Sequence, residues 1–241
     1  MLLLAKMNIA IVGYGKMGHE MEKIARAKGI NIISIIDPNS SSANYREINE
    51  ESLHNVDVCI DFTEPGAVME NIRKISKLGK CIVVGTTGWY DHLEEAKSIV
   101  SQSNVGFIYA SNFSIGVNIF FKIIENAARI INSIDSYDVF GYEVHHSRKL
   151  DAPSGTAKAI EQILVKNIQR KKEVPFASVR SGTVPGTHVV GFDSAADTIE
   201  LKHTARNREG FAIGAVMAAE WINGRKGFYE INDMMKDVIG G

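Results

Sequence analysis

The chain has 241 residues, of which 45% are hydrophobic and 23% charged, with 21 glycines and 5 prolines. This composition is typical of a folded globular protein and excludes collagen-like and disordered chains, and the length suits one large domain or two small ones. Because 27 basic residues nearly balance 28 acidic residues, for a net charge of −1, nothing in the charge favours nucleic-acid or membrane partners.

The first half of the chain alternates strands and helices. Buried strands are predicted at residues 8–12, 32–36, 56–62, 81–84 and 105–110, with helices between them at residues 16–28, 64–78 and 90–102. Because consecutive parallel strands need crossover connections, this alternation predicts a Rossmann-type, doubly wound parallel sheet of the α/β class.

The pattern changes near residue 112. Helices are predicted at residues 116–131 and 153–169, and strands at residues 137–145, 177–180, 187–192 and 197–203. Strands in succession predict hairpins, and therefore a mixed or antiparallel sheet in a second, α+β domain. A last helix is predicted at residues 211–223, and we expect it to return the chain to the first domain. The expected domains are residues 1–113, completed by 209–241, and residues 114–208.

The cysteines and the first residues favour a cytoplasmic protein. Cys59 and Cys81 both lie in apolar, strand-like runs, which suits buried thiols in a reducing compartment better than a disulfide. Residues 1–6 are apolar but too few for a signal-peptide core, so we expect a short ragged extension before Met7. No apolar run reaches the roughly 18 residues that a membrane-spanning helix needs.

A glycine-rich loop follows the first predicted strand and opens the first predicted helix. Gly13, Gly15 and Gly18 have the spacing of a dinucleotide fingerprint, in which the glycines make the turn, admit a pyrophosphate and let the helix pack on the strand. Asp37 ends the second predicted strand, where its carboxylate can accept hydrogen bonds from a ribose. Together these features favour a dinucleotide site over a simple packing turn.

Two further loops, at residues 85–88 and 110–114, follow predicted strands of the same sheet. Ligands of open α/β sheets bind over the carboxyl ends of the strands, so these loops can contact nicotinamide and ribose. Taken alone, each loop is better explained as an ordinary turn, because Gly, Ser and Thr favour turns.

The densest polar segment of the sequence runs from Glu143 to Thr156. Its glutamate and adjacent histidines suggest a metal site, but neighbouring residues of a strand point to opposite faces, so His145 and His146 cannot readily share one ion. We therefore expect no metal. A solvated loop with incidental histidines is the simplest alternative.

The end of this segment has the residues of a helix N-terminus, namely Asp151, Pro153, Ser154 and Thr156. Such a terminus would place the amides of residues 154–156 near His145 and Lys149. That arrangement is a carboxylate receptor beside a proton donor. Basic residues at 166–172 and 202–208 add positive charge to the second domain, which favours a small anionic substrate, although the first of these runs is better explained as a solvated helix end.

At these residues the sequence resembles the bacterial dihydrodipicolinate reductases (4-hydroxy-tetrahydrodipicolinate reductases) of lysine and diaminopimelate biosynthesis. The resemblance rests on six segments that follow the family order and span nearly the whole chain: GYGKMG, DFTEPGAV, GTTGW, SNFSIGVN, EVHHSRKLDAPSGTA and HTARNREGFAIGAVMAAEWI. The departures are small. Pro38 stands where NADPH-dependent members often have Arg, Ser111 replaces a common Pro, and the chain is somewhat short.

The resemblance implies an NAD(P)H-dependent oxidoreductase that reduces 4-hydroxy-tetrahydrodipicolinate to tetrahydrodipicolinate with loss of water. It implies a dinucleotide-binding first domain, a second domain for substrate binding and oligomerisation, and a homotetramer. The implied catalytic residues are His145 and Lys149, and the implied substrate-binding residues are His146, Lys149, Ser154, Gly155 and Thr156. The implied cofactor-binding residues are Gly13, Tyr14, Gly15, Lys16, Met17, Gly18, Asp37, Gly85, Thr86, Thr87, Ala110, Ser111, Asn112 and Phe113.

The end of the second predicted strand favours NADH over NADPH. Asp37 would repel the 2′-phosphate of NADPH, and Pro38 offers no side-chain donor to clamp it. Lys16 and Arg46 could compensate in part, so NADPH should still be accepted. Two rival functions remain: another two-domain dehydrogenase with an amino-acid-derived substrate, and a catalytically silent dinucleotide sensor. The intact segment with both His145 and Lys149 argues against the sensor.

Overall fold

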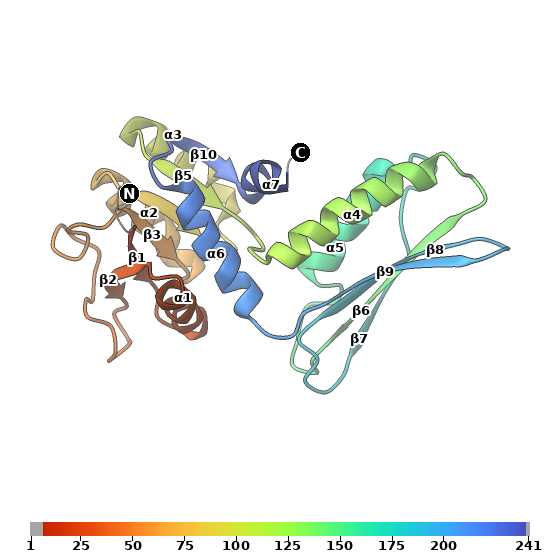
Figure 1. Ribbon diagram of the computed structural model, residues 1–241, viewed down its shortest axis with the longest axis horizontal. Coiled ribbons are helices and arrows are strands. Elements are labelled where there is room, and N and C mark those ends of the chain that lie inside the picture. Colours follow the sequence, from red (N-terminus) through yellow and green to blue (C-terminus); the bar gives the residue numbers. More distant parts are fainter. Residues whose placement is uncertain (1–6, 240–241) are drawn as a thin grey trace, which may run out of the picture. The chain divides into compact units, whose positions relative to one another are not determined.

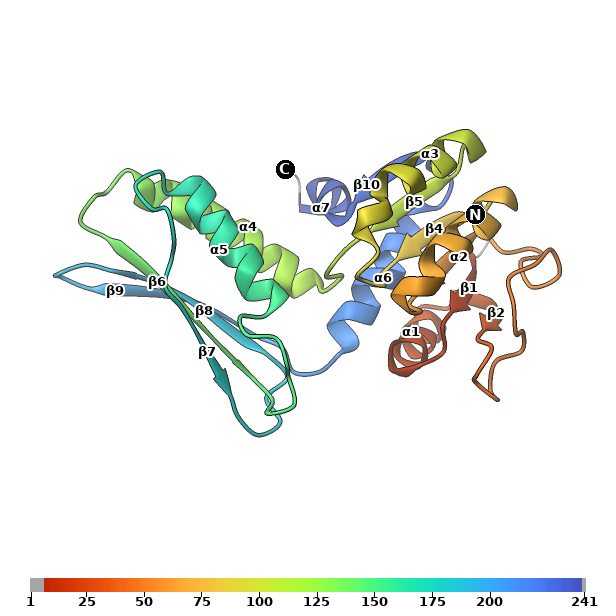
Figure 2. The same ribbon diagram turned by 180° about the vertical axis from the view of Figure 1, so that it is seen from behind.

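A computed structural model describes residues 7–239, which form two compact units (Figure 1, Figure 2). The first unit comprises residues 7–114 and 208–239, and the second is Ile115–Asn207. The extension expected at residues 1–6 lies outside the described residues. Within residues 7–239, no helix combines the length and the apolar character needed to span a membrane.

The first unit contains a six-stranded parallel sheet in the order β10-β5-β4-β3-β1-β2, which confirms the predicted doubly wound α/β fold. Its strands are β1 (Asn8–Val12), β2 (Asn31–Ile36), β3 (Val58–Asp61), β4 (Cys81–Val84), β5 (Gly106–Tyr109) and β10 (Gly227–Glu230). The central strands are continuous apolar runs because helices bury both faces of the sheet. All carboxyl ends of the parallel strands therefore lie along one edge of the sheet.

Helices of the first unit cover this sheet: α1 (Lys16–Ala27), α2 (Pro65–Lys77), α3 (Leu93–Ser103), α6 (Glu209–Ile222) and α7 (Ile231–Ile239). Helix α1 packs against α6, and α2 packs against α3. The helix predicted at residues 90–102 is divided, because a 3₁₀ turn, η1 (Tyr90–His92), precedes α3. The prediction that α6 is the last helix is wrong.

Strand β10 and helix α7, which complete the first unit, are absent from the predictions. Strand β10 extends the sheet beside β5, and Phe228 stacks on Phe107 with ring centroids 4.6 Å apart. Strand β4 is equally short but is a continuous apolar run, whereas β10 is an edge strand of half-buried and exposed residues, so β10 has no clear signal in the sequence. Helix α7 does have one, because Ile231, Met234 and Met235 share a buried face at helical spacing.

The second unit is a mixed four-stranded sheet in the order β7-β6-β8-β9, with two helices on one face (Figure 1, Figure 2). Its elements are α4 (Ile115–Asn132), β6 (Asp138–His145), α5 (Gly155–Asn167), β7 (Phe176–Arg180), β8 (Thr187–Asp193) and β9 (Thr198–Thr204). The predicted mixed sheet is confirmed, but the predicted run of hairpins is wrong in part. Strand β7 pairs in parallel with β6, across α5, and the consecutive strands that pair as a hairpin are β8 and β9.

Strand β6 is the central element of the second unit. Its residues are alternately buried and partly exposed, and the buried ones face α4 and α5. Val139 on this face packs into an apolar core with Phe120, Ile160 and Phe192. Glu143, towards the end of the same face, is fully buried although it is charged, and this burial requires partners. The fold thus brings polar chemistry to one end of an otherwise apolar layer.

Candidate active site

The glycine-rich loop of the first unit fits a bound pyrophosphate. Gly13 has a φ of +88°, and a Cβ there would lie 2.4 Å from the backbone oxygen of Phe62; a Cβ on Gly18 would lie 2.5 Å from the oxygen of Gly13. The protein's own packing therefore requires both glycines. A Cβ on Gly15 would meet no atom within 4 Å, so the open space over Gly15 remains for a ligand.

Helix α1 begins beside this open space. Gly15 is its N-cap and cannot cap with a side chain, and the first turn contains no acidic residue. The free N–H groups of that turn and the positive end of the helix dipole are therefore available to phosphate. The fingerprint predicted from the sequence has the local geometry that a dinucleotide requires.

Two adjoining cavities, of about 360 and 450 Å³, lie at the carboxyl ends of the strands and share Gly15, Phe62 and Thr63. Of the predicted cofactor residues, Gly13, Gly15 and Asp37 line the first, and Gly15, Lys16, Met17, Gly85, Thr86 and Thr87 line the second. Tyr14, Gly18, Ala110, Ser111, Asn112 and Phe113 line neither of these two cavities. Phe113 is almost fully buried, with its ring centroid 6.1 Å from that of Phe62, so it supports the site from within the core.

Asp37 joins the glycine loop to the end of β2. Its Oδ2 accepts the amide of Tyr14 at 2.7 Å, and its Oδ1 accepts the amides of Asn39 at 2.7 Å and Ser40 at 3.0 Å. Burial alone would raise the pKa of Asp37, but these amides outweigh burial and lower it, so the carboxylate is ionised. Arg46, distant in sequence, lines the same cavity and donates to the backbone oxygen of Asp37 at 3.2 Å.

Asp61, which the sequence analysis did not single out, holds the neighbouring loops together. Its buried carboxylate accepts hydrogen bonds from Thr63 Oγ1 at 2.7 Å, Asn71 Nδ2 at 2.8 Å and Thr86 Oγ1 at 3.2 Å. Burial raises the pKa of Asp61, although these donors oppose the shift. The hydroxyl of Thr86 thus serves the loop structure. A charged residue that ends an otherwise apolar strand is the signal that could have identified Asp61.

The second unit contains the predicted helix N-terminus. Ser154 is the N-cap of α5, and its Oγ accepts the amide of Ala157 at 3.1 Å. The Ser154 amide donates to Glu143 Oε1 at 2.9 Å, so this amide is already committed within the protein. The expectation that it faces a ligand therefore needs correction, whereas Gly155 is exposed and Thr156 is half-buried.

A carboxylate already lies at the predicted carboxylate receptor. Lys149 Nζ donates to Asp151 Oδ1 at 2.7 Å. The hydrogen bond from Lys149 is the largest cause of the lowered pKa of Asp151, and the amide of Gly155 contributes further. The cation and the helix N-terminus thus converge on one carboxylate, supplied here by the chain itself.

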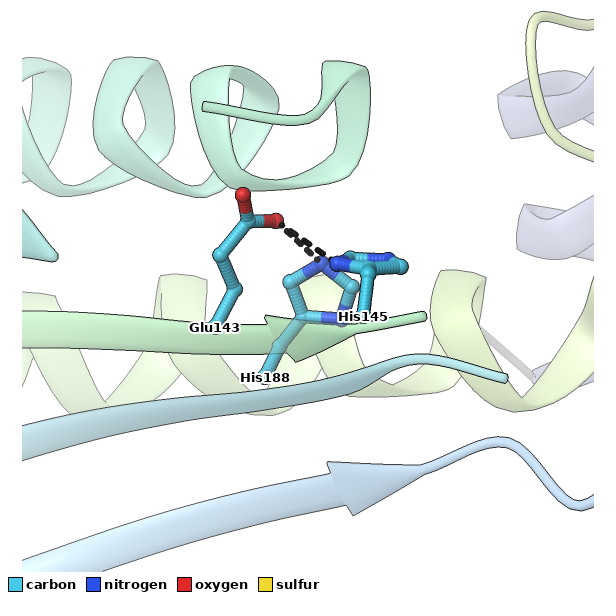
Figure 3. A group of neighbouring side chains, drawn as sticks. All are labelled: Glu143, His145 and His188. Atoms are coloured by element: carbon cyan, nitrogen blue, oxygen red, sulfur yellow. Dashed lines mark ion pairs between the residues drawn. The ribbon is translucent and has the colours of Figure 1, made fainter. Parts of the chain in front are cut away.

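His145 and Glu143 lie on the buried face of β6, and β8 brings His188 beside them (Figure 3). Glu143 Oε2 is 3.3 Å from His145 Nδ1 and 3.4 Å from His188 Nε2. Burial lowers the pKa of His145, against the opposing charge of Glu143. Burial likewise lowers the pKa of His188, to about 4, so both rings are mainly neutral near pH 7.

Arg180 on β7 completes this cluster. Its Nη2 donates to Glu143 Oε1 at 2.8 Å and to the backbone oxygen of Asp151 at 2.6 Å. Burial would raise the pKa of Glu143, but hydrogen bonds from Ser154, Arg180 and Ser178 outweigh it and lower the pKa to about 2. Neither His188 nor Arg180 was among the predicted site residues, because only the strand pairing brings them to Glu143.

Glu143, His145 and His188 are also the group, within the described residues, whose spacing would admit a metal ion. His146, which follows β6, does not belong to that group, as the alternation of a strand predicts. The guanidinium of Arg180 on the same carboxylate disfavours a second cation there.

Comparison with known proteins identifies the family. The profile described as dihydrodipicolinate reductase, N-terminus, matches residues 7–113, and the corresponding C-terminus profile matches residues 116–235. The 4-hydroxy-tetrahydrodipicolinate reductase of Christiangramia forsetii is 38% identical, over 97% of this chain and 99% of that one. The enzyme of the same name from Methanoculleus marisnigri is 41% identical over 76% of each chain. A dipicolinate-bound dihydrodipicolinate reductase from Paenisporosarcina sp. TG-14 superimposes with a TM-score of 0.79 at 25% identity, covering 95% of this chain and 99% of that one.

Proposed function

The chain belongs to the dihydrodipicolinate reductase family of oxidoreductases, and we propose which of its residues carry out the family's reaction. That reaction, in lysine and diaminopimelate biosynthesis, reduces 4-hydroxy-tetrahydrodipicolinate with NAD(P)H. It takes up one proton and releases tetrahydrodipicolinate, NAD(P)⁺ and water. The observation that carries the residue assignment is the Asp151 carboxylate held by Lys149 beside the N-terminus of α5.

We assign a ring carboxylate of the substrate to the place that Asp151 now takes. Lys149 and the amides of Gly155 and Thr156 would bind it, with His146 completing the set. A cation together with helix N-terminal amides suits a planar carboxylate. Ser154 contributes through its helix cap and through Glu143, since its amide is already bonded.

His145 is the proposed proton donor to the departing hydroxyl. Its ring is neutral in the free protein because burial lowers its pKa. A bound dianionic substrate would favour the imidazolium, since an opposite charge nearby stabilises the charged form. The proton would then be held at the ring where the hydroxyl leaves.

The first unit would bind the cofactor, which supplies the hydride when bound. Gly13, Gly15 and the first turn of α1 would hold the pyrophosphate, and Gly85 to Thr87 would contact the nicotinamide half. Asp37 would accept a ribose hydroxyl at the lone pairs that its amide partners leave free. We propose that NADH is preferred, because the ionised Asp37 carboxylate opposes a 2′-phosphate.

We further propose a cytoplasmic homotetramer. The face of the second sheet away from α4 and α5 presents Phe140, Tyr142, Val144, Ala177 and Val179, and Val179 is 47% exposed. Such a face is normally covered in a stable protein. Cys59 is buried and Cys81 half-buried, and both are free thiols, as a reducing compartment favours.

The proposed reaction is tested by following NAD(P)H oxidation with substrate generated in place by dihydrodipicolinate synthase. We expect oxidation that depends on the synthase product and persists after dialysis against EDTA. Cofactor binding without any oxidation would indicate the dinucleotide sensor instead. Oxidation with other amino-acid-derived substrates alone would indicate a different dehydrogenase.

A further inference from the structure

The two carboxylate oxygens of Glu143 face different groups. Oε1 accepts three hydrogen bonds: from the Ser154 amide at 2.9 Å, Ser178 Oγ at 2.8 Å and Arg180 Nη2 at 2.8 Å. Oε2 is turned towards the two histidines of the cluster (Figure 3). Donors from α5 and β7 therefore fix the side chain from one end and aim its other oxygen.

Glu143 Oε2 and the ring nitrogen Nδ1 of His145 can form a hydrogen bond with each other. Glu143 Oε2 and His145 Nδ1 are both buried and have no hydrogen-bond partner among the described residues, and they lie 3.3 Å apart. A carboxylate oxygen only accepts hydrogen bonds, so the stable arrangement places the hydrogen of the neutral ring on Nδ1. The other ring nitrogen, Nε2, then carries the lone pair.

We propose that Glu143 is a positioning residue that holds His145 in the Nδ1–H tautomer, so that Nε2 exchanges the proton with the substrate. This inference rests on the proposed function for the role of Nε2, but the tautomer itself does not. His188 Nε2, 3.4 Å from Oε2 and 3.2 Å from Ser154 Oγ, borders the carboxylate on its remaining side. Arg180 keeps Glu143 charged and in place.

A metal is the competing explanation for the same three side chains, because ligands of one tetrahedral ion lie at comparable separations. Two observations favour the positioning role. The Arg180 guanidinium already neutralises Glu143, and Lys149 adds positive charge that influences His145. A further cation would have to overcome both charges.

The first test is the tautomer of His145 in the wild-type protein, read from ring-nitrogen shifts in ¹⁵N-histidine-labelled protein at a pH where the ring is neutral. The His145 signals are assigned by their loss in His145→Gln. We expect hydrogen on Nδ1. Hydrogen on Nε2 would overturn the proposal whatever any variant does. This measurement needs no substrate, so it stands apart from the proposed reaction.

The second test compares Glu143→Gln with the control Glu173→Gln, the same substitution at an exposed position before β7. The glutamine keeps the shape of the side chain. Its carbonyl oxygen can still accept the hydrogen bond from Arg180, and its NH₂ group would then face His145 Nδ1 as a donor. We expect the tautomer to reverse and kcat to fall about 10²- to 10⁴-fold, with KM for the substrate changed less than about threefold. Glu173→Gln makes the same substitution outside the cluster and should leave the tautomer and kcat nearly unchanged.

Three results would overturn the positioning role. One is a Glu143→Gln variant that folds, by circular dichroism, and keeps wild-type kcat. Another is equal loss of kcat in both variants, which would indicate a purely structural effect. The third is loss of wild-type activity on EDTA treatment with recovery on adding Zn²⁺ alone, which would make the cluster a metal site.

Discussion

Lys149 donates a hydrogen bond of 2.7 Å to Asp151, two residues further along the loop that leads into α5. The lysine side chain is 23% exposed and the aspartate 54% exposed, so the pair lies at the surface of the second unit, where a ligand can reach it. In the proposed site, a substrate carboxylate would bind Lys149 at the place that Asp151 now takes. The internal carboxylate would then compete with the substrate for the same cation.

Removing this competitor should therefore improve substrate binding. We expect Asp151→Asn to lower KM about two- to fivefold with little change in kcat, since an exposed ion pair contributes about 0.2–1 kcal/mol. Lys149→Ala should instead raise KM and lower kcat together. Steady-state kinetics of both variants with saturating cofactor give the answer, and a higher KM in Asp151→Asn would contradict the competition.

His145→Ala should fold normally, bind cofactor and lose about 10²- to 10⁴-fold in kcat, the range for removal of a positioned proton-transfer group. The loss should fall on kcat more than on KM, because the ring acts mainly in the transition state. Cofactor binding measured by fluorescence serves as the control for folding. Retention of near wild-type kcat would exclude His145 as the proton donor.

The parts of the site that sequence could predict are those set by local spacing. The Gly13 to Gly18 loop and the Ser154 cap both depend on residues that are close in sequence, so the sequence pattern alone predicts their geometry. Arg180 and His188 are different, because they reach Glu143 only through the register of β7 and β8 on β6. No sequence period specifies which strands pair.

The same limit explains the error in the second sheet. Consecutive strands usually form hairpins, but α5 allows β7 to lie parallel to β6 on the side away from β8. Once that order is known, alternation along β6 places Glu143 and His145 on one face, as the sequence pattern indicates. The sequence therefore predicts that Glu143 and His145 share a face, but only the strand order shows that Arg180 and His188 contact Glu143.

Acid should destabilise the protein through His188. Burial, with the charge of His145, lowers its pKa from 6.5 to about 4, so the unfolded chain binds more protons between these values. Above pH 6.5, His188 is mainly neutral in both the folded and the unfolded chain, so its protonation costs no stability. As the pH falls from 6.5 to 4, the unfolded chain is protonated first, and the free energy of unfolding decreases, by about 2 kcal/mol at pH 5.

We therefore expect His188→Gln to lose less stability than wild type when urea unfolding is compared at pH 7.5 and 5. His92→Gln is the matched control, because the His92 side chain is 57% exposed and should follow wild type. An unfolding free energy with the same pH dependence in all three proteins would show that His188 is not the responsible group.

The uncovered face of the second sheet predicts the assembly. Val179 on β7 pairs with Val144 on this face, so Val179→Asp should place a charge within the proposed interface. We expect a tetramer for wild type and smaller species for Val179→Asp by multi-angle light scattering at micromolar concentration. Ile130→Asp, at a 65% exposed position on α4, should remain tetrameric. A wild-type monomer would exclude the homotetramer.

In the proposed cofactor site, two side chains of one cavity would decide between NADH and NADPH. Asp37 is ionised and would repel a 2′-phosphate, whereas Arg46 in the same cavity would attract it. Arg46 already donates hydrogen bonds to the backbone oxygens of Asp37 and Ser40, and its exposure to solvent weakens its attraction for phosphate. The repulsion from Asp37 should therefore prevail, with NADPH still accepted.

The ratio of kcat/KM for NADH and NADPH at fixed ionic strength tests this balance. We expect NADH to be preferred. Arg46→Ala should increase the ratio of kcat/KM for NADH to that for NADPH by up to about fivefold, equivalent to about 1 kcal/mol of exposed ion pairing. Asp37→Asn should narrow it, because the amide removes the negative charge. Lys16→Ala should weaken both cofactors alike, since Lys16 lies in the cavity that the two cofactors would share. A wild-type preference for NADPH of more than about tenfold, worth roughly 1.4 kcal/mol, would mean that Arg46 or Lys16 outweighs Asp37. The alanine variant that abolished this NADPH preference would then identify the residue that binds the 2′-phosphate.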